Sequence, residues 1–225
     1  MSDLLYLDHN ATTPVLPEAQ EAMAEALAEC WGNPSSSHAY GRAARALVDK
    51  ARRSILTLSD SDPGASVVFT SGATEAINQV IRSAPAGRLV TSALEHPAVL
   101  EAAAAHGELE IELVPVEDNG CIDALKMLEA VDTFDDTVLV SCMAANNETG
   151  VIQPIGELVS PLRAKQVPLL VDASQMAGRL PLNFETPDYL VMTAHKLGGP
   201  KGVGALVMRS NTDISSLIVG GGQES

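Results

Sequence analysis

The sequence predicts an α/β fold with a mostly parallel sheet sandwiched by helices. From residue 66 onward, short apolar runs rich in β-branched residues alternate with Ala- and Leu-rich stretches. Strands that read as continuous apolar runs and are separated by helices are typical of a parallel sheet covered on both faces. The predicted strands cover residues 66–70, 88–92, 110–114, 137–142, 167–171, 189–193 and 204–208.

Two predicted helices precede the first strand. Residues 17–30 start with proline, which is favourable in a first helical turn. Residues 42–58 place apolar side chains on one stripe at helical spacing, with charged side chains elsewhere. The other helix-like stretches cover residues 75–82, 97–105 and 155–164, and a turn-rich loop covers residues 31–38.

The composition limits the class of protein. Of the 225 residues, 46% are hydrophobic and 3% aromatic, so a large core must consist mainly of Ala, Val, Leu and Ile. The 14 basic and 29 acidic residues give a formal charge of -15, which argues against nucleic acid and anionic membranes as partners. The start of the chain does not resemble a secretory signal and no stretch is long enough to span a bilayer, so we expect a cytoplasmic protein.

The three cysteines, Cys30, Cys121 and Cys142, are widely spaced and form no CxxC pair. Neither a zinc or other metal site nor a disulfide framework is therefore predicted. Cys142 shares strand parity with Val138 and Val140, which indicates a buried core thiol.

Polar or ionisable residues follow five of the predicted strands. In open parallel sheets, ligands bind beyond the carboxyl ends of the strands, so these residues mark a predicted binding site. They are residues 70–75, Glu95 with His96, residues 146–150, residues 172–175 and residues 193–196.

Residues 71–74 could hold an anion. Small residues at a strand-to-helix turn leave backbone N–H groups free at the helix N-terminus, and Thr74 can add a hydroxyl donor. Taken alone, an ordinary helix cap with Thr74 and Glu75 in the first turn is the simpler interpretation.

Asp172 and Lys196 follow consecutive predicted strands. A buried carboxylate needs a cationic partner or several donors, and a protonated pyridine nitrogen would be such a partner. Capping of the next helix is the alternative for Asp172.

Lys196 also has two interpretations. A lysine in a dry pocket can form a Schiff base, whereas an isolated lysine in a Gly-rich loop is usually exposed. Lys201 is the competing lysine, and we assign it to the loop.

His96 could stack on a planar ring or transfer a proton, or it could simply begin a helix beside Pro97. Asn147 and Gln175 could hydrogen-bond a ring hydroxyl, or they could serve turn and cap roles. His38 is assigned to the loop. The combination decides between these alternatives: an anion cradle, an aspartate and a lysine on the strand ends of one sheet are what pyridoxal phosphate (PLP) requires.

A set of short strings, in order along the chain, resembles the cysteine desulfurases of the NifS/IscS type. These belong to the aminotransferase class V branch of the fold type I PLP enzymes. The strings are LDHNATTP at 7–14, WGNPSS at 31–36, FTSGATE at 69–75, EH at 95–96, NNETG at 146–150, VDASQ at 171–175, HK at 195–196, GPKGVG at 199–204 and GGGQE at 220–224.

The resemblance implies a role for each matching residue. Lys196 would bond to the PLP aldehyde, and Asp172 would pair with the pyridine nitrogen. His96 would stack on the ring and take part in proton transfer, which makes Lys196 and His96 the expected catalytic residues. Gln175 and Asn147 would contact the ring hydroxyl, with Asn147 also near the substrate. The phosphate would be held by Ala73, Thr74, Thr193 and His195. Thr193 stands where the family more often has Ser, and Gly198 where it more often has an aromatic residue.

The sequence departs from the family pattern at its end. In the family, GGGQE leads into an Arg-x-Gly-Thr stretch and a small domain that carries the nucleophilic cysteine and an arginine for the substrate carboxylate. We therefore expect a C-terminally truncated chain with an N-terminal segment over residues 1–15, a PLP-binding large domain over residues 16–225 and no small domain. None of the three cysteines matches the family's nucleophile position, so the chain alone is expected to be inactive or weakly active.

The function that the resemblance implies is PLP-dependent desulfuration. L-cysteine would yield L-alanine, with the sulfur transferred to an enzyme cysteine for iron–sulfur cluster or thiocofactor synthesis. A homodimer is expected, and a sulfur-acceptor protein or scaffold could be a partner. The alternatives are another class V PLP enzyme, such as an aminotransferase or a selenocysteine lyase-like protein, and a non-catalytic PLP-binding remnant.

Overall fold

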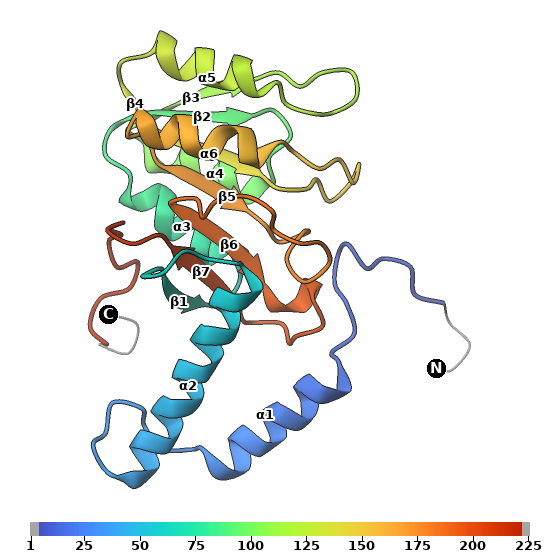
Figure 1. Cartoon of the computed structure of the whole chain (residues 1–225), viewed down its shortest axis with the longest axis vertical. Helices are drawn as coiled ribbons and strands as arrows, with labels where there is room; N and C mark the ends of the chain where they lie inside the picture. Colours follow the sequence, from blue (N-terminus) through green and yellow to red (C-terminus); the bar gives the residue numbers. More distant parts are fainter. Residues whose placement is uncertain (1–4, 222–225) are drawn as a thin grey trace.

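A seven-stranded sheet runs through the centre of the protein in a computed structural model, which describes residues 5–221 (Figure 1). The strand order is β1-β7-β6-β5-β4-β2-β3. Strand β7 runs antiparallel to both of its neighbours, and the other pairs are parallel. The strands are β1 Ser66–Thr70, β2 Gly87–Ser92, β3 Leu109–Val114, β4 Thr137–Met143, β5 Leu169–Asp172, β6 Tyr189–Thr193 and β7 Gly204–Met208. The predicted mostly parallel sheet is confirmed.

Helices cover both faces of this sheet. The α-helices are α1 Pro17–Glu29, α2 Ala39–Leu58, α3 Ala73–Ser83, α4 Pro97–His106, α5 Ala124–Thr133 and α6 Ile155–Ala164, and a short 3-10 helix, η1, covers Ala194–Lys196. One apolar cluster joins α5 and α6 to the sheet, and the other joins α3 and α4 to it. Neighbouring residues of a strand, such as Leu170 and Val171, enter opposite clusters. This two-sided burial explains why the strands read as unbroken apolar runs.

Strand β5 begins two residues later than predicted and ends on Asp172. The Val167 N–H donates to Leu162 O at the end of α6, and Pro168 has no N–H to give to a neighbouring strand. The strand consequently starts at Leu169, and Asp172 becomes its last residue.

Helix α5 is absent from the prediction. It is capped by Asp123, whose Oδ1 accepts hydrogen bonds from the N–H groups of Leu125 (2.9 Å) and Lys126 (3.4 Å). Asp before an apolar helical pattern is a usual helix start, so the signal was present in the sequence.

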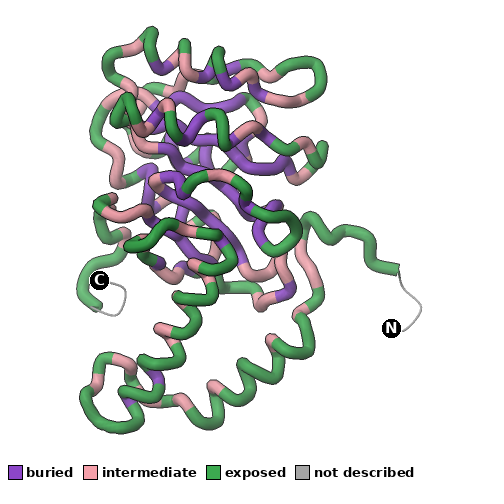
Figure 2. The backbone as a smooth tube through the Cα atoms, viewed as in Figure 1, coloured by how far each residue is buried: buried purple, intermediate pink, exposed green. Residues whose placement is uncertain are grey.

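Helices α1 and α2 project from the body of the protein (Figure 1). All residues of α1 are at least partly exposed, and in α2 only Gly41 and Ala44 are buried (Figure 2). The predicted apolar stripe of α2 therefore exists but is mostly uncovered; Leu47, for example, is 38% exposed. At the far end of the pair, the rings of Trp31 and Tyr40 stack with centroids 4.9 Å apart.

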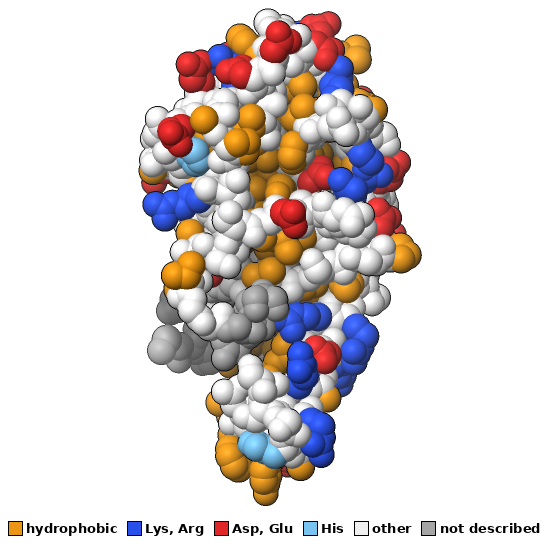
Figure 3. All heavy atoms as spheres, turned by 90° about the vertical axis from the view of Figure 1, so that its left-hand side faces the viewer, with side chains coloured by type: hydrophobic (Ala, Val, Ile, Leu, Met, Phe, Trp, Pro, Cys, Tyr) orange, Lys and Arg blue, Asp and Glu red, His pale blue; other side chains and the backbone are white. Residues whose placement is uncertain are grey.

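Charge is unevenly distributed between these two helices. Helix α1 carries four Glu and no Lys or Arg, whereas Lys and Arg outnumber Asp in α2. Basic side chains accordingly gather over the lower part of the molecule (Figure 3). Across residues 5–221, no helix combines the length and the apolar character that a bilayer crossing would require.

Gly204, the first residue of β7, pairs with both Thr70 of β1 and Thr193 of β6. A Cβ atom at this position would lie 2.6 Å from Gly72 Cα and 2.9 Å from Thr70 Oγ1. Only glycine therefore lets β7 approach the turn between β1 and α3.

We expect Gly204→Ala to lower the free energy of unfolding by about 1–3 kcal/mol, because the added methyl group must push backbone apart. The matched control is Gly156→Ala in α6, where the nearest atom to an added Cβ is Phe184 Cβ at 3.8 Å. Urea denaturation of both variants measures the difference. Equal stability of the two variants would show that the β7 contact can relax without cost.

Candidate active site

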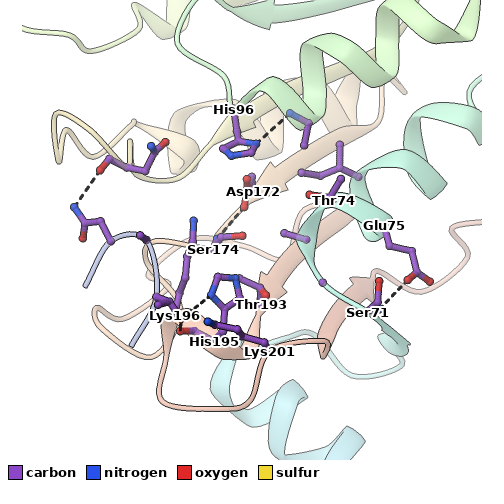
Figure 4. Close-up of a pocket in the computed structure, with 18 of the residues that line it drawn as sticks. Ser71, Thr74, Glu75, His96, Asp172, Ser174, Thr193, His195, Lys196 and Lys201 are labelled. Atoms are coloured by element: carbon purple, nitrogen blue, oxygen red, sulfur yellow. Dashed lines mark hydrogen bonds between the residues drawn. The ribbon is translucent and has the colours of Figure 1, made fainter. Parts of the chain in front are cut away.

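A cavity of about 780 Å³ lies at the carboxyl ends of the parallel strands. Its wall includes all of the predicted site residues except Gln175 (Figure 4). They are Ala73, Thr74, His96, Asn147, Asp172, Thr193, His195 and Lys196.

The N-terminus of α3 forms one wall of the cavity. Its N-cap, Gly72, has no side chain, and no hydroxyl or carboxylate of the described residues caps this helix end. The Ser71 N–H before it donates to Glu75 Oε2 (2.8 Å). Thr74 and Glu75 lie in the first turn, as the cap interpretation expects, but the N-cap residue itself supplies no capping side chain. First-turn N–H groups without helical partners, together with Thr74, make this wall suitable for an anion.

Thr193 and His195 face the same space as the α3 N-terminus (Figure 4). Burial lowers the pKa of His195, and the positive charges of Lys196 and Lys201 lower it further. Its Nδ1 lies 3.2 Å from Thr12 Oγ1. Lys201, which the sequence analysis assigned to the loop, is exposed but also lines the cavity, so it adds positive charge beside the anion wall.

Asp172 lies opposite the α3 N-terminus, on the last residue of β5. Its side chain is buried, and Oδ1 accepts a hydrogen bond from the Ser174 N–H (2.9 Å). That bond is the cap-like contact expected of an Asp before a turn. The carboxylate also faces the cavity, and its pairing with a pyridine nitrogen stays a prediction. Among the described residues no helix lies between β5 and β6, so the alternative role is capping of a turn and not of a helix.

Lys196 ends the 3-10 helix η1 and is partly buried in the cavity wall. Burial lowers the pKa of its ammonium group below the usual value; the Asp172 carboxylate opposes this shift and the Arg179 guanidinium adds to it. A lowered pKa increases the share of free amine, the form that attacks a carbonyl carbon.

His96 is both the N-cap of α4 and part of the cavity wall. Its Nδ1 accepts a hydrogen bond from the Ala98 N–H (3.1 Å), as expected for a histidine at a helix start. Its ring points into the space above Asp172 (Figure 4). Stacking on a ligand ring stays a prediction.

Gln175 does not line the cavity. Its Nε2 donates to Asn10 O (2.9 Å), and its Oε1 accepts from Arg179 Nη1 (3.1 Å). Its contact with a ring hydroxyl stays a prediction that would require these bonds to change. Asn147 lines the cavity, and its backbone oxygen accepts from Asn10 Nδ2 (3.0 Å).

The residues that sequence reasoning missed lie mainly in residues 8–13, which we term the N-terminal strap. Asp8, Asn10, Ala11 and Thr12 line the cavity, although the strap belongs to the predicted separate segment over residues 1–15. The strap was visible in the sequence only as part of a family string. Nothing in its own pattern indicates that it lies beside strand ends more than 180 residues further along.

Glu95, which precedes the cavity residue His96, is buried. Its Oε1 accepts hydrogen bonds from the Met143 N–H (2.7 Å) and from Ser92 Oγ (3.1 Å), while Oε2 has no partner among the described residues. Burial raises the pKa of Glu95 to about 7; the Met143 hydrogen bond opposes this shift and the charge of Asp172 adds to it. Glu95 can therefore carry a proton below about pH 7, because burial disfavours its charged form.

Cys142 is fully buried in the core, as predicted. Burial raises the pKa of its thiol well above the ordinary value, and the charge of Glu95 adds to this shift. Cys30 and Cys121 are partly exposed. Among the described residues, no cysteine lines the cavity. Most of the predicted string at 220–224 lies outside the described residues.

At the strand ends of an α/β fold, the cavity brings together a helix N-terminus without a side-chain cap, a buried carboxylate and a partly buried lysine. The family model described as "Aminotransferase class-V" matches residues 5–224. The chain therefore belongs to the class V aminotransferase family, whose members use PLP.

Three similar proteins illustrate this membership. The cysteine desulfurase IscS of Dictyoglomus turgidum is 41% identical, over 98% of this chain and 58% of its own length. The crystal structure of a NifS-like protein from Rickettsia africae has a TM-score of 0.88 at 32% identity, covering 98% of this chain and 62% of that chain. A structure of SspA in complex with cysteine has a TM-score of 0.89 at 30% identity, covering 98% and 66%. The chain thus spans somewhat more than half the length of the curated relatives it matches.

The described residues fit PLP by the chemistry of their donors. The phosphate is an anion, and the α3 N-terminus with Thr74 and His195 offers N–H and O–H donors. The pyridinium is a cation, and Asp172 offers a buried carboxylate. The aldehyde needs an amine, and Lys196 offers one with a lowered pKa.

We expect Glu95→Gln to remove a pH dependence of stability. An acid with a raised folded pKa contributes stability below its unfolded pKa of about 4.5, and this contribution is lost as the pH rises through about 7. The parent chain should therefore lose about 3 kcal/mol of unfolding free energy relative to the variant between about pH 4.5 and about pH 8.

Urea denaturation across this pH range measures the effect. Glu101→Gln in α4 is the matched control, because Glu101 is exposed and should leave the pH profile unchanged. Parallel profiles for the parent and Glu95→Gln would show that Glu95 titrates as an ordinary carboxyl group.

Proposed function

We propose that this chain forms the PLP-binding part of a cysteine desulfurase, with residues 16–225 as the large domain and residues 1–15 adding one wall of the site. The observation that carries the proposal is the placement of the Lys196 amine and the Asp172 carboxylate in one cavity with a helix N-terminus. The relatives named cysteine desulfurase, and the SspA structure with cysteine, support L-cysteine as the amino-acid substrate.

In this proposal the cofactor is held at three points. The α3 N-terminus with Ala73, Thr74, Thr193 and His195 binds the phosphate. Asp172 binds the pyridine nitrogen, and Lys196 binds the aldehyde carbon. When bound, PLP supplies an electron sink for chemistry at the carbon atoms of the amino acid. Asn147, and Gln175 after a change of partners, bind the ring hydroxyl.

Two side chains, Lys196 and His96, are then assigned to proton transfer. The Lys196 amine has a lowered pKa, so when it is not bonded to the cofactor it could accept a proton near the substrate carbon and return it. The His96 Nε2 atom is left for proton transfer, because Nδ1 accepts the Ala98 N–H bond. Asp172 orients the ring, and because burial raises the pKa of Glu95 to about 7, Glu95 adds no full negative charge near it below that pH.

The sulfur step requires a thiolate that attacks the sulfur of L-cysteine. The C–S bond breaks, the new S–S bond forms a persulfide, and the amino-acid carbon gains a proton to give L-alanine. We do not assign the thiolate to Cys30, Cys121 or Cys142, because none of them lines the cavity. The proposal therefore gives this chain the cofactor and amino-acid half of the reaction, with little or no turnover by itself.

We also propose a homodimer in the cytoplasm that passes sulfur to an acceptor protein or scaffold for iron–sulfur cluster or thiocofactor synthesis. The relatives named cysteine desulfurase IscS support the iron–sulfur part of this proposal.

We expect Lys196→Ala to abolish the visible absorption band that PLP gives when it is bonded to a lysine, because the amine is lost. The matched variant Lys201→Ala should keep the band and bind PLP more weakly, since it removes only a charge beside the phosphate wall. Spectra of the purified chains with added PLP test both. A band that survives in Lys196→Ala and disappears in Lys201→Ala would reverse the assignment, and no band in the parent would refute the proposed function.

A further inference from the structure

Arg179 joins three segments that lie far apart in the sequence. Its Nη2 donates to His9 O (2.6 Å), and its Nη1 donates to Asn10 Oδ1 (2.9 Å) and to Gln175 Oε1 (3.1 Å). Its Nε donates to the Lys196 backbone oxygen (3.2 Å). A planar guanidinium can hold four such acceptors in one fixed arrangement, which a lysine cannot do.

The N-terminal strap depends on hydrogen bonds rather than on burial. None of its residues is buried, although several of them line the cavity. Residues 12 and 13 have their own bonds to the turn after β6: the Thr13 N–H and the two threonine hydroxyls bond to His195, and the Gly198 N–H donates to Thr13 Oγ1. The part around Asn10 is held by Arg179, by Gln175 Nε2 on Asn10 O and by Asn10 Nδ2 on Asn147 O. Segments with few apolar contacts open easily, so the loss of the Arg179 bonds should loosen the strap, and most of all the part around Asn10.

We infer that Arg179 is a positioning residue, which holds the strap and the Lys196 backbone in one frame and thereby shapes both the cavity wall and the surroundings of the lysine amine. A role of Arg179 in catalysis rests on the proposed function. Its hydrogen bonds to the strap and to the Lys196 backbone do not depend on that function.

The charges around Lys196 agree with this role. Asp172 on β5 faces the amine, Asp8 of the strap and Glu148 of the 146–150 turn line the same cavity, and His195 is its neighbour in η1. Burial lowers the pKa of the amine, the Asp172 carboxylate opposes this shift, and the Arg179 charge adds to it. Removing the Arg179 charge should therefore raise the pKa of the Lys196 amine.

The first test is amide hydrogen exchange of strap peptides, followed by mass spectrometry on the 225-residue chain. In Arg179→Gln and in Arg179→Lys, amide exchange over residues 8–13 should be about tenfold faster, because both variants lose the guanidinium group that bonds to His9 and Asn10. Arg82→Gln, an exposed arginine at the far end of α3, is the matched control and should exchange like the parent. Peptides from α5, which lies away from the site, show whether the effect is local.

The second test is the pH profile of Lys196 acetylation by acetic anhydride, with exposed Lys50 as internal reference. Arg179→Gln should move the Lys196 midpoint upward, whereas Arg179→Lys should leave it near the parent value, because the charge is kept. Unchanged strap exchange in Arg179→Gln, or faster exchange that extends equally to α5, would overturn the inference. Neither test uses PLP, so a failure of the proposed function would appear separately as the missing absorption band.

Discussion

The close approach of Gly204 to Gly72 is the constraint on which the cavity depends. Strand β7 lies between β1 and β6, and its first residue pairs with the last residue of each. Because Gly204 has no side chain, the start of β7 can lie directly against Gly72, the N-cap of α3. The N-terminus of α3 and Lys196, more than 100 residues apart in the sequence, line the same cavity at this end of the sheet.

The parts of the fold that could be predicted are those that depend on local pattern. Every strand was found because burial on both faces produces an apolar run, and such runs are visible without any knowledge of the partner strands. The start of β5 was misplaced because the competing acceptor for the Val167 N–H belongs to α6, which only tertiary structure reveals. Helix α2 was recognised by its stripe, but no sequence pattern says whether a stripe is covered.

In the candidate site, too, the residues marked by a local pattern could be predicted and those that depend on tertiary contacts could not. Asp172 and Lys196 could be identified because strand ends are where an α/β protein binds ligands. Glu95 was noted only as the neighbour of His96. Its importance comes from the Met143 N–H on another strand and from the nearby Asp172 charge, and both depend on the order of strands in the sheet. Arg179 escaped notice for a similar reason, since its acceptors belong to three separate segments.

The bonds between the strap and His195 also have a consequence for the order of assembly. Thr12 and Thr13 bond to His195, which lies 183 and 182 residues further along the chain. Contacts of such long sequence separation form late, because the loop between them must first be closed. The sheet and its two apolar layers can form while this end of the chain is still free. The pocket is therefore completed at the end of folding, and cofactor capture becomes a late event in the life of the newly made chain.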